Sequence, residues 1–271
     1  MLSPTIFFML TRSVLFFFIL AVISGFFATV NAQDKTDERA QVIVSRAIQV
    51  MGGDRYLHVT SQVGRGKYSV FQNNAVVSFQ SFIDVIVFPD KERTEFRGGG
   101  TKTIQTNSGR NGWVYDGDQE LIKVQTEKQV ANFVTGLRVS LDNLLRGYWK
   151  EEAELSYVGR RPASLGKRND VVRLTYKDGV VIEFEFADDG TPAKSVYKHT
   201  AADGSEVTEE DRYAQFIDVG GIKAPFIIDR YTNGAQNSRI NYDSVEFNQS
   251  IPDSIFAKPL SPKELKKDLK I

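Results

Sequence analysis

Side chains able to do acid–base, nucleophilic or metal chemistry are few in this chain of 271 residues. Its two histidines, His58 and His199, are far apart in sequence, and neither has a second histidine at a metal-binding spacing. The chain has no cysteine, which excludes thiol catalysis, cysteine-ligated zinc and disulfide frameworks. Nucleophile elbows, phosphate-binding glycine loops and zinc-protease motifs are also missing. We therefore expect a protein that is not an enzyme and that uses no cofactor or metal.

Two groups of acidic residues resemble functional sites, one a calcium-binding loop and the other a carboxylate pair. The stretch 116–120 begins like a calcium-binding loop, but Leu121 stands where such a loop needs glycine and no glutamate closes it. Glu183 and Glu185 could form a carboxylate pair, yet their spacing of two places them together on one face of a strand. We interpret both groups as solvated surface acids. The informative signal is instead the apolar patterning of the chain.

A long amphipathic stretch from Glu127 to Trp149 interrupts a sequence that otherwise alternates as strands do. At about 100° per residue, its apolar side chains fall within one stripe roughly 120° wide, which predicts a helix. Gly136 lies inside this helix and costs about 1 kcal/mol relative to alanine, so a kink or a split into two helices is compatible with the pattern. The stripe consists of Val130, Phe133, Val134, Leu137, Leu141, Leu144, Leu145 and Tyr148.

The segments on both sides of this helix alternate apolar and polar residues with a period of two. This pattern predicts an antiparallel sheet with one apolar face. With a first helix expected over residues 37–51, the fold class is α+β and mostly β. The simplest architecture is a curved antiparallel sheet with the long helix laid against its concave apolar face. Whether the long helix fills that face or covers a cavity decides the function.

The N-terminus carries a targeting pattern. Arg12 precedes a Phe-rich apolar run over residues 14–27, and Val30-Asn31-Ala32 supplies the small residues that a signal peptidase reads. We expect a cleaved signal peptide over residues 1–32 and an exported mature chain. An uncleaved N-terminal anchor is the alternative, because the run approaches spanning length.

Cleavage would leave 271 − 32 = 239 residues, enough for one domain over residues 33–260 and a short C-terminal helix or tail over residues 261–271. Loss of Arg12 changes the formal balance from 34 basic and 34 acidic residues to 33 − 34 = −1. That near-neutral value favours neither nucleic acid nor an electrostatic membrane tether, and we expect no nucleic-acid partner.

Three segments resemble the outer-membrane lipoprotein-carrier (LolA/LolB-like) family. Phe88–Phe96 is similar to the family's strand that ends in proline and is followed by an arginine-bearing strand. Thr106–Asp116 is close to its Ser-Asp-Gly, Trp-x-Tyr-Asp pattern, and Ile251–Phe256 resembles its final phrase after the last strand. Their order and spacing fit nearly the whole mature chain.

The resemblance implies a periplasmic protein with a curved antiparallel half-open β-barrel and helices covering its concave apolar face. This barrel would enclose an apolar cavity for acyl chains. Its partners would be lipid or lipoprotein acyl chains, with an inner-membrane export complex or a membrane-anchored acceptor as exchange partners. No cysteine follows the signal segment, so the membrane-attached acceptor form is not expected. The sheet after the central helix looks longer than in the minimal carrier, which leaves the identity of the cargo open.

This hypothesis assigns candidate ligand-binding residues to a wall and a lid, although an ordinary core is the alternative for each of them. Arg93 matches the family's arginine strand and would steady the lid or hold a polar lipid head, unless it is a surface arginine. We also expect Trp113 fluorescence to respond to lipid. The wall candidates are Phe79, Ile83, Val85, Trp113, Tyr115, Ile182, Phe184 and Phe186, and the lid candidates are Phe133, Leu137, Leu141 and Leu144.

The leading hypothesis is a soluble periplasmic carrier or binder of lipoprotein acyl chains or other lipids, in an apolar cavity closed by a helical lid. The alternative is a periplasmic sensor or interaction module of the same fold that docks on a membrane-protein partner. A hydrolase acting on a lipid-like substrate is a third hypothesis, and the missing nucleophile–base pattern argues against it.

Overall fold

The structure is a computed structural model that describes residues 37–164, 166–265, 269 and 271. The expected signal peptide and part of the expected C-terminal tail lie outside these residues. No helix among the described residues is long and apolar enough to cross a bilayer.

One antiparallel sheet of thirteen strands forms the body of the protein, in the order β6-β5-β4-β3-β2-β1-β13-β12-β11-β10-β9-β8-β7. The edge strands β6 and β7 are not paired with each other, so the sheet stays open. The prediction of a mostly β, half-open antiparallel fold with helices is confirmed. The strands are β1 (Ser61–Gln72), β2 (Ala75–Val87), β3 (Lys91–Gly98), β4 (Thr101–Ser108), β5 (Asn111–Asp116), β6 (Leu121–Val124), β7 (Ala153–Pro162), β8 (Arg168–Tyr176), β9 (Val181–Phe186), β10 (Pro192–Thr200), β11 (Glu206–Val219), β12 (Ile222–Thr232) and β13 (Ala235–Phe247).

The sheet is built from two consecutive meanders. Strands β1–β6 pair in sequence order, and so do β7–β13, while the helical segment connects the two sets. The meanders join where the first strand pairs with the last, with Gly64 opposite Val245 and Tyr68 opposite Ile240. This junction places residues from both ends of the chain side by side in the middle of the sheet.

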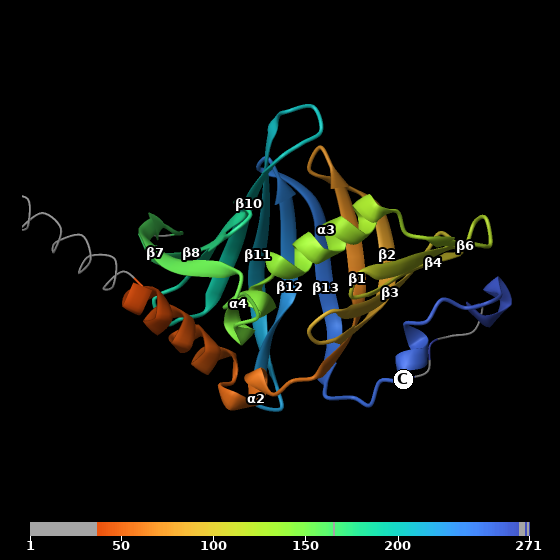
Figure 1. Cartoon of the computed structure of the whole chain (residues 1–271), viewed down its shortest axis with the longest axis horizontal. Helices are drawn as coiled ribbons and strands as arrows, with labels where there is room; N and C mark the ends of the chain where they lie inside the picture. Colours follow the sequence, from red (N-terminus) through yellow and green to blue (C-terminus); the bar gives the residue numbers. More distant parts are fainter. Residues whose placement is uncertain (1–36, 165, 266–268, 270) are drawn as a thin grey trace, which may run out of the picture.

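Helices cover one face of this sheet, called here the inner face. The helix over residues 37–51 and the short helix α4 (Leu141–Arg146) lie at the β7–β10 end, and the short helix α2 (Asp54–Leu57) lies against β12. The helix α3 (Glu127–Arg138) crosses the middle strands (Figure 1). The first group buries apolar side chains such as Ala47 and Leu144 against Leu174 and Phe184 of the sheet. This packing forms the main core and fills that end of the inner face.

The predicted central helix is divided into α3 and α4. Gly136 lies inside α3 without ending it, and the break comes at Val139–Ser140 instead. Ser140 is extended, and its hydroxyl accepts a hydrogen bond from the backbone N–H of Asn143 at 3.1 Å, so it begins a new helix as an N-cap. The sequence pattern does not show this break because the apolar stripe continues through it.

The chain after β13 packs on the outer face, opposite the helices. It includes two short 3-10 helices, η1 (Asp253–Ile255) and η2 (Pro262–Leu265). Phe256 packs against Val63 and Val85, while Leu265 packs against Ile104 and Trp113. The part of the outer face around Val63, Val85, Ile104 and Trp113 is therefore buried and not solvated.

Candidate functional site

A cavity of about 1200 Å³ lies between α3 and the inner face of the sheet. Its roof is the segment from Phe133 to Asn143, and its walls come from β1–β4 and β11–β13. Tyr148 and Trp149 of the loop after α4, together with Tyr176, line the end nearest the main core. The cavity exists because the core helices stop short of the middle strands, and α3 alone crosses them (Figure 1).

The roof helix α3 is amphipathic but loosely packed. Its apolar residues Val130, Phe133, Val134 and Leu137 are only partly buried, and no residue of α3 is fully buried. Leu141 and Leu144 of α4, which continue the same stripe, are 9% and 1% exposed. The stripe therefore covers a cavity in its first half and builds core in its second half.

The N-terminal end of α3 is fixed by polar contacts. Thr126 and Gln129 form a capping box, in which the Thr126 backbone N–H donates to Gln129 Oε1 at 2.9 Å. The preceding Gln125 is buried and exchanges two hydrogen bonds with the Asn107 side chain, at 2.8 and 3.1 Å. This end is tied to β4.

The C-terminal end of α3 is fixed by Arg138. Its guanidinium donates to both carboxylate oxygens of Asp178 at 2.8 and 2.9 Å and lies 4.0 Å from the centre of the Tyr176 ring. The Tyr176 hydroxyl and the Asn143 amide both donate to the Arg138 carbonyl, each at 2.7 Å. The hydrogen bonds from Arg138 lower the pKa of Asp178 to about 2. A helix held mainly by its two ends has the construction of a lid.

The cavity floor is not uniformly apolar, contrary to the sequence-based expectation. Inner-face positions of adjacent strands carry an aromatic group together with ionisable side chains. The aromatic residues are Tyr68, Phe82, Phe96 and Tyr242, and the ionisable residues are Asp84, Glu92, Asp211, Tyr213 and Arg230. The one sequence signal that pointed to them is Asp84, a lone charge inside the apolar run Phe82-Ile83-Asp84-Val85-Ile86.

Burial in this floor raises the pKa values of its acids and phenols. Desolvation, followed by the neighbouring charge of Glu92, raises the pKa of Asp84 to about 8. Desolvation also raises the pKa values of Glu92 and Asp211. The hydroxyl of Tyr213 lies 3.0 Å from Ser195 Oγ, and burial raises the pKa of this phenol as well. The floor therefore favours neutral forms of its own acids.

Three of the predicted site residues, Phe133, Leu137 and Leu141, line the cavity. Four others do not line it, because they belong to the main core that helix 37–51 and α4 form with the sheet. These are Leu144 of α4 and Ile182, Phe184 and Phe186 of β9. The predicted lid thus includes two core residues, Leu141 and Leu144, and the three wall predictions of β9 were wrong. Their inner-face orientation was right, but the space beside them is filled.

The remaining wall predictions lie on the outer face. In β2 the even positions line the cavity, so Phe79, Ile83 and Val85 point the other way. Phe79 is 60% exposed, and the other two pack toward the C-terminal segment. Trp113 and Tyr115 are also buried away from the cavity, and Trp113 Nε1 donates to the Phe256 carbonyl at 2.9 Å.

Arg93 is neither a lid contact, a lipid-head contact nor a surface residue. It is 6% exposed on the outer face, where its guanidinium donates to Glu95 Oε1 at 2.6 Å and to the Ile255 carbonyl at 2.6 Å. Lys102 completes this buried group by contacting Glu95 Oε2 at 2.8 Å. Arg93 therefore fastens the C-terminal segment to β3.

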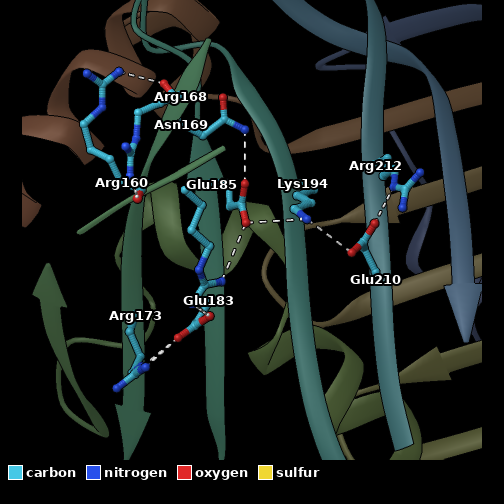
Figure 2. A network of polar contacts seen from close by, with 10 residues as sticks. Arg160, Arg168, Asn169, Arg173, Glu183, Glu185, Lys194, Glu210 and Arg212 are labelled. Carbon is cyan, nitrogen blue, oxygen red and sulfur yellow. Dashed lines mark hydrogen bonds and ion pairs between the residues drawn. The ribbon is translucent and has the colours of Figure 1, made fainter. Parts of the chain in front are cut away.

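The acids Glu183 and Glu185 belong to an ion-pair network on the outer face (Figure 2). Arg173 donates to Glu183 at 2.6 and 3.0 Å. Glu185 is only 2% exposed, accepts from Asn169 at 3.1 Å and lies 3.5 Å from Lys194 Nζ. The interpretation of Glu185 as a solvated surface acid was wrong, because basic side chains of adjacent strands cover it. Each of these acids is matched by basic partners, and neither lines the cavity.

The fold and the cavity together define a class: a half-open antiparallel sheet with a helix lying over a cavity on its inner face. No protein-family model and no curated protein matches the sequence. Solved structures do match, and they show that the chain has a LolA-like fold.

Three of these structures share most of the fold. A DUF1329 family protein from Desulfovibrio piger is 14% identical, with a TM-score of 0.57 over 80% of this chain and 97% of that one. A putative outer membrane lipoprotein-sorting protein domain from Vibrio parahaemolyticus is 10% identical, with a TM-score of 0.53 over 82% and 96%. A LolA superfamily protein from Nitrosomonas europaea is 16% identical, with a TM-score of 0.53 over 81% and 97%.

Proposed function

We propose that this chain is a periplasmic binder or carrier of the acyl chains of lipids or lipoproteins, and not an enzyme. The cargo lies in the cavity beneath α3 and is exchanged with membrane partners, such as an export complex or a membrane-anchored acceptor. The periplasmic location rests on the signal-peptide pattern of residues 1–32. The LolA-like fold, shared with a putative lipoprotein-sorting domain, supports the choice of cargo.

The observation that carries this proposal is the contrast between the two halves of the central apolar stripe. In α4 the stripe is buried in the core, whereas in α3 it spans a cavity of about 1200 Å³ with its side chains only partly buried. Burying an acyl chain there would release about 0.8 kcal/mol per methylene group before ordering costs. The same ligand would complete the packing of α3.

The direct test is native mass spectrometry of the protein purified from its own periplasm, followed by lipid extraction. We expect a co-purifying lipid or lipoprotein chain in the parent protein and its loss in Leu137→Asp, which places a carboxylate on the cavity side of α3. Stability should fall by only about 1 kcal/mol, because α3 contributes no fully buried residue.

A matched control is Val42→Asp, which changes a 56% exposed valine of another helix that does not line the cavity. This variant should keep its lipid. Parent protein without any bound lipid, or Leu137→Asp with lipid retained, would contradict the proposal.

A role as an interaction module on a membrane-protein partner is the second candidate. It is favoured by the exposed apolar tip of the β1–β2 hairpin, where Val76, Val77 and Phe79 are 55%, 57% and 60% exposed. Site-specific photocrosslinking from position 79 in intact cells tests it. Capture of one membrane protein, unaffected by Leu137→Asp, would favour this function over the carrier.

A further inference from the structure

The centre of the cavity floor contains an acid with one unused oxygen. Asp84 is 8% exposed and lines the cavity from β2. Thr94 Oγ1 donates to Asp84 Oδ1 at 2.7 Å. Among the described residues, none donates a hydrogen bond to Asp84 Oδ2. This oxygen is not enclosed by the protein but is accessible from the cavity, so a ligand group in the cavity can reach it.

Glu92 provides a second acid beside the first, and neither acid has a cation of its own. Glu92 Oε1 lies 3.4 Å from the same Thr94 hydroxyl, whose single proton is already given to Asp84. Arg230, the nearest cavity cation, has its Nε 3.7 Å from Asp211 Oδ1. In the part of the chain that the structure describes, no lysine or arginine nitrogen lies within 4.0 Å of Asp84 or Glu92.

Aromatic rings adjoin the two acids on the same inner face. The centre of the Phe82 ring is 5.4 Å from that of Tyr242 and 6.4 Å from that of Phe96. Phe96 in turn lies 5.4 Å from Tyr68. Ring faces attract cations, and alkylammonium groups bind where aromatic rings and carboxylates converge. This arrangement is independent of the acids and favours the same kind of ligand.

We propose that the cavity binds amphiphiles that carry a cationic ammonium group, with this group between Asp84, Glu92 and the aromatic rings and the apolar chain beneath α3. The inference rests on the proposed function and names its ligand class. An anionic head group would face two unpaired acids, and the nearest cation is already shared with Asp211. A metal ion is also disfavoured, because among the described residues no group of three or more acids or histidines could hold one.

Proton displacement should accompany binding. Burial and the neighbouring Glu92 raise the pKa of Asp84 to about 8, while the Thr94 hydrogen bond and the charge of Arg230 oppose the rise. Tyr242, which faces Asp84 from β13, is a buried phenol with a raised pKa and stays neutral. Near pH 7 Asp84 therefore carries a proton, which an ammonium ligand would replace. Ammonium affinity should increase from about pH 6 to about pH 9, because an alkylammonium keeps its charge up to about pH 10.

Isothermal titration calorimetry with three probes of equal chain length tests the inference: dodecylammonium, dodecanol and dodecanoate, each below its micelle concentration. At about pH 8 we expect dodecylammonium to bind at least roughly tenfold tighter than dodecanol, the factor that one charge-assisted hydrogen bond supplies. Dodecanoate should bind most weakly. Titrations in buffers of different ionisation enthalpy should show proton release with dodecylammonium only.

The variant that isolates the site is Asp84→Asn, which keeps an oxygen for the Thr94 hydrogen bond. It should lose both the preference for dodecylammonium over dodecanol and the proton release. Asp243→Asn, which removes an exposed carboxylate that does not line the cavity, is the control and should retain both.

Equal affinity for dodecylammonium and dodecanol in the parent protein would overturn the ammonium site and leave the carrier proposal intact. Retention of the ammonium preference by Asp84→Asn would overturn the site in the same way. If none of the three probes binds, both the ammonium site and the proposed carrier function are wrong.

Discussion

Gly64 on β1 allows the Tyr242 ring to lie on the cavity floor. A Cβ atom added at this position would lie 2.4 Å from Tyr242 Cε1 and 3.0 Å from its Cδ1, which is too close for the ring to stay in place. Tyr242 is also wedged between Phe82 and Phe226, at 5.4 and 6.3 Å between ring centres. A single methyl group should therefore disturb the whole aromatic group.

We predict that Gly64→Ala destabilises the protein by about 1–3 kcal/mol, the usual cost of overpacking, and weakens ligand binding. Urea melts and titration with an apolar ligand measure the two effects. Stability and affinity equal to those of the parent would show that the floor can rearrange freely. Gly136→Ala gives the contrast, because it adds the same methyl group where nothing lies within 4 Å and should therefore not lower stability.

Asp84 should make stability depend on pH. In the unfolded chain this acid titrates near 3.8, whereas in the folded protein its pKa is about 8. Between these values the folded state binds more protons at Asp84, so the contribution of Asp84 to stability is greatest at low pH and is lost as pH rises through about 8. Glu92 and Asp211, whose pKa values are also raised, act in the same direction.

Urea melts from about pH 5 to about pH 9 should therefore show the parent losing stability relative to Asp84→Asn, on the order of a few kcal/mol. The variant escapes this cost because an amide does not ionise. Parallel stability curves for the two proteins would mean that Asp84 is hydrated and titrates normally.

At the scale of the element, α3 is held at its two ends by hydrogen bonds and an ion pair. At the C-terminal end, Arg138 donates two hydrogen bonds to the carboxylate of Asp178. Asp178→Asn keeps an acceptor for the Val180 backbone N–H of the β8–β9 turn but removes the charge. We predict faster hydrogen–deuterium exchange in residues 127–138 and faster ligand release, with the sheet amides unchanged. High salt should reduce the difference in exchange rate between Asp178→Asn and the parent protein, since the ion pair is exposed to solvent.

Asp243→Asn is the matched control for the Arg138–Asp178 ion pair, because it neutralises another exposed aspartate, which lies on β13. Unchanged exchange of α3 in Asp178→Asn would mean that the Tyr176 and Asn143 hydrogen bonds hold the helix without the ion pair.

Gly136 keeps α3 intrinsically weak. It lies inside the helix with open space around the position of a Cβ atom, so alanine fits without a clash. We predict that Gly136→Ala stabilises α3 by about 1 kcal/mol, the difference in helix propensity. Exchange of the α3 amides should become slower, and ligand uptake should slow with it if the helix must move to admit a chain. Unaltered α3 exchange would show that its ends, and not its helix propensity, set its mobility.

At the scale of the molecule, the sequence predicted the fold well and the site poorly. Period-two alternation and turn residues are local signals, so the strands and the open antiparallel sheet followed from them. Which face holds the cavity is a non-local property. In β2 both faces are apolar, and no local signal shows that Phe256 covers the side that carries Val85. Helix 37–51 separates Phe184 from the cavity in the same way, and no local pattern around Phe184 indicates it.

The two tryptophans report on the two faces of the sheet and allow this assignment to be tested. Trp149 lines the cavity, and its indole N–H donates to the Leu144 carbonyl at 3.0 Å. Trp113 is 4% exposed on the outer face beneath the C-terminal segment.

We therefore predict the reverse of the sequence-based expectation. Ligand should change the fluorescence of the parent and of Trp113→Phe, which keeps Trp149, and should leave Trp149→Phe almost unchanged. Because the chain has two tryptophans, each variant reports on a single face. A response that survives in Trp149→Phe and disappears in Trp113→Phe would place the ligand on the outer face, in competition with the C-terminal segment.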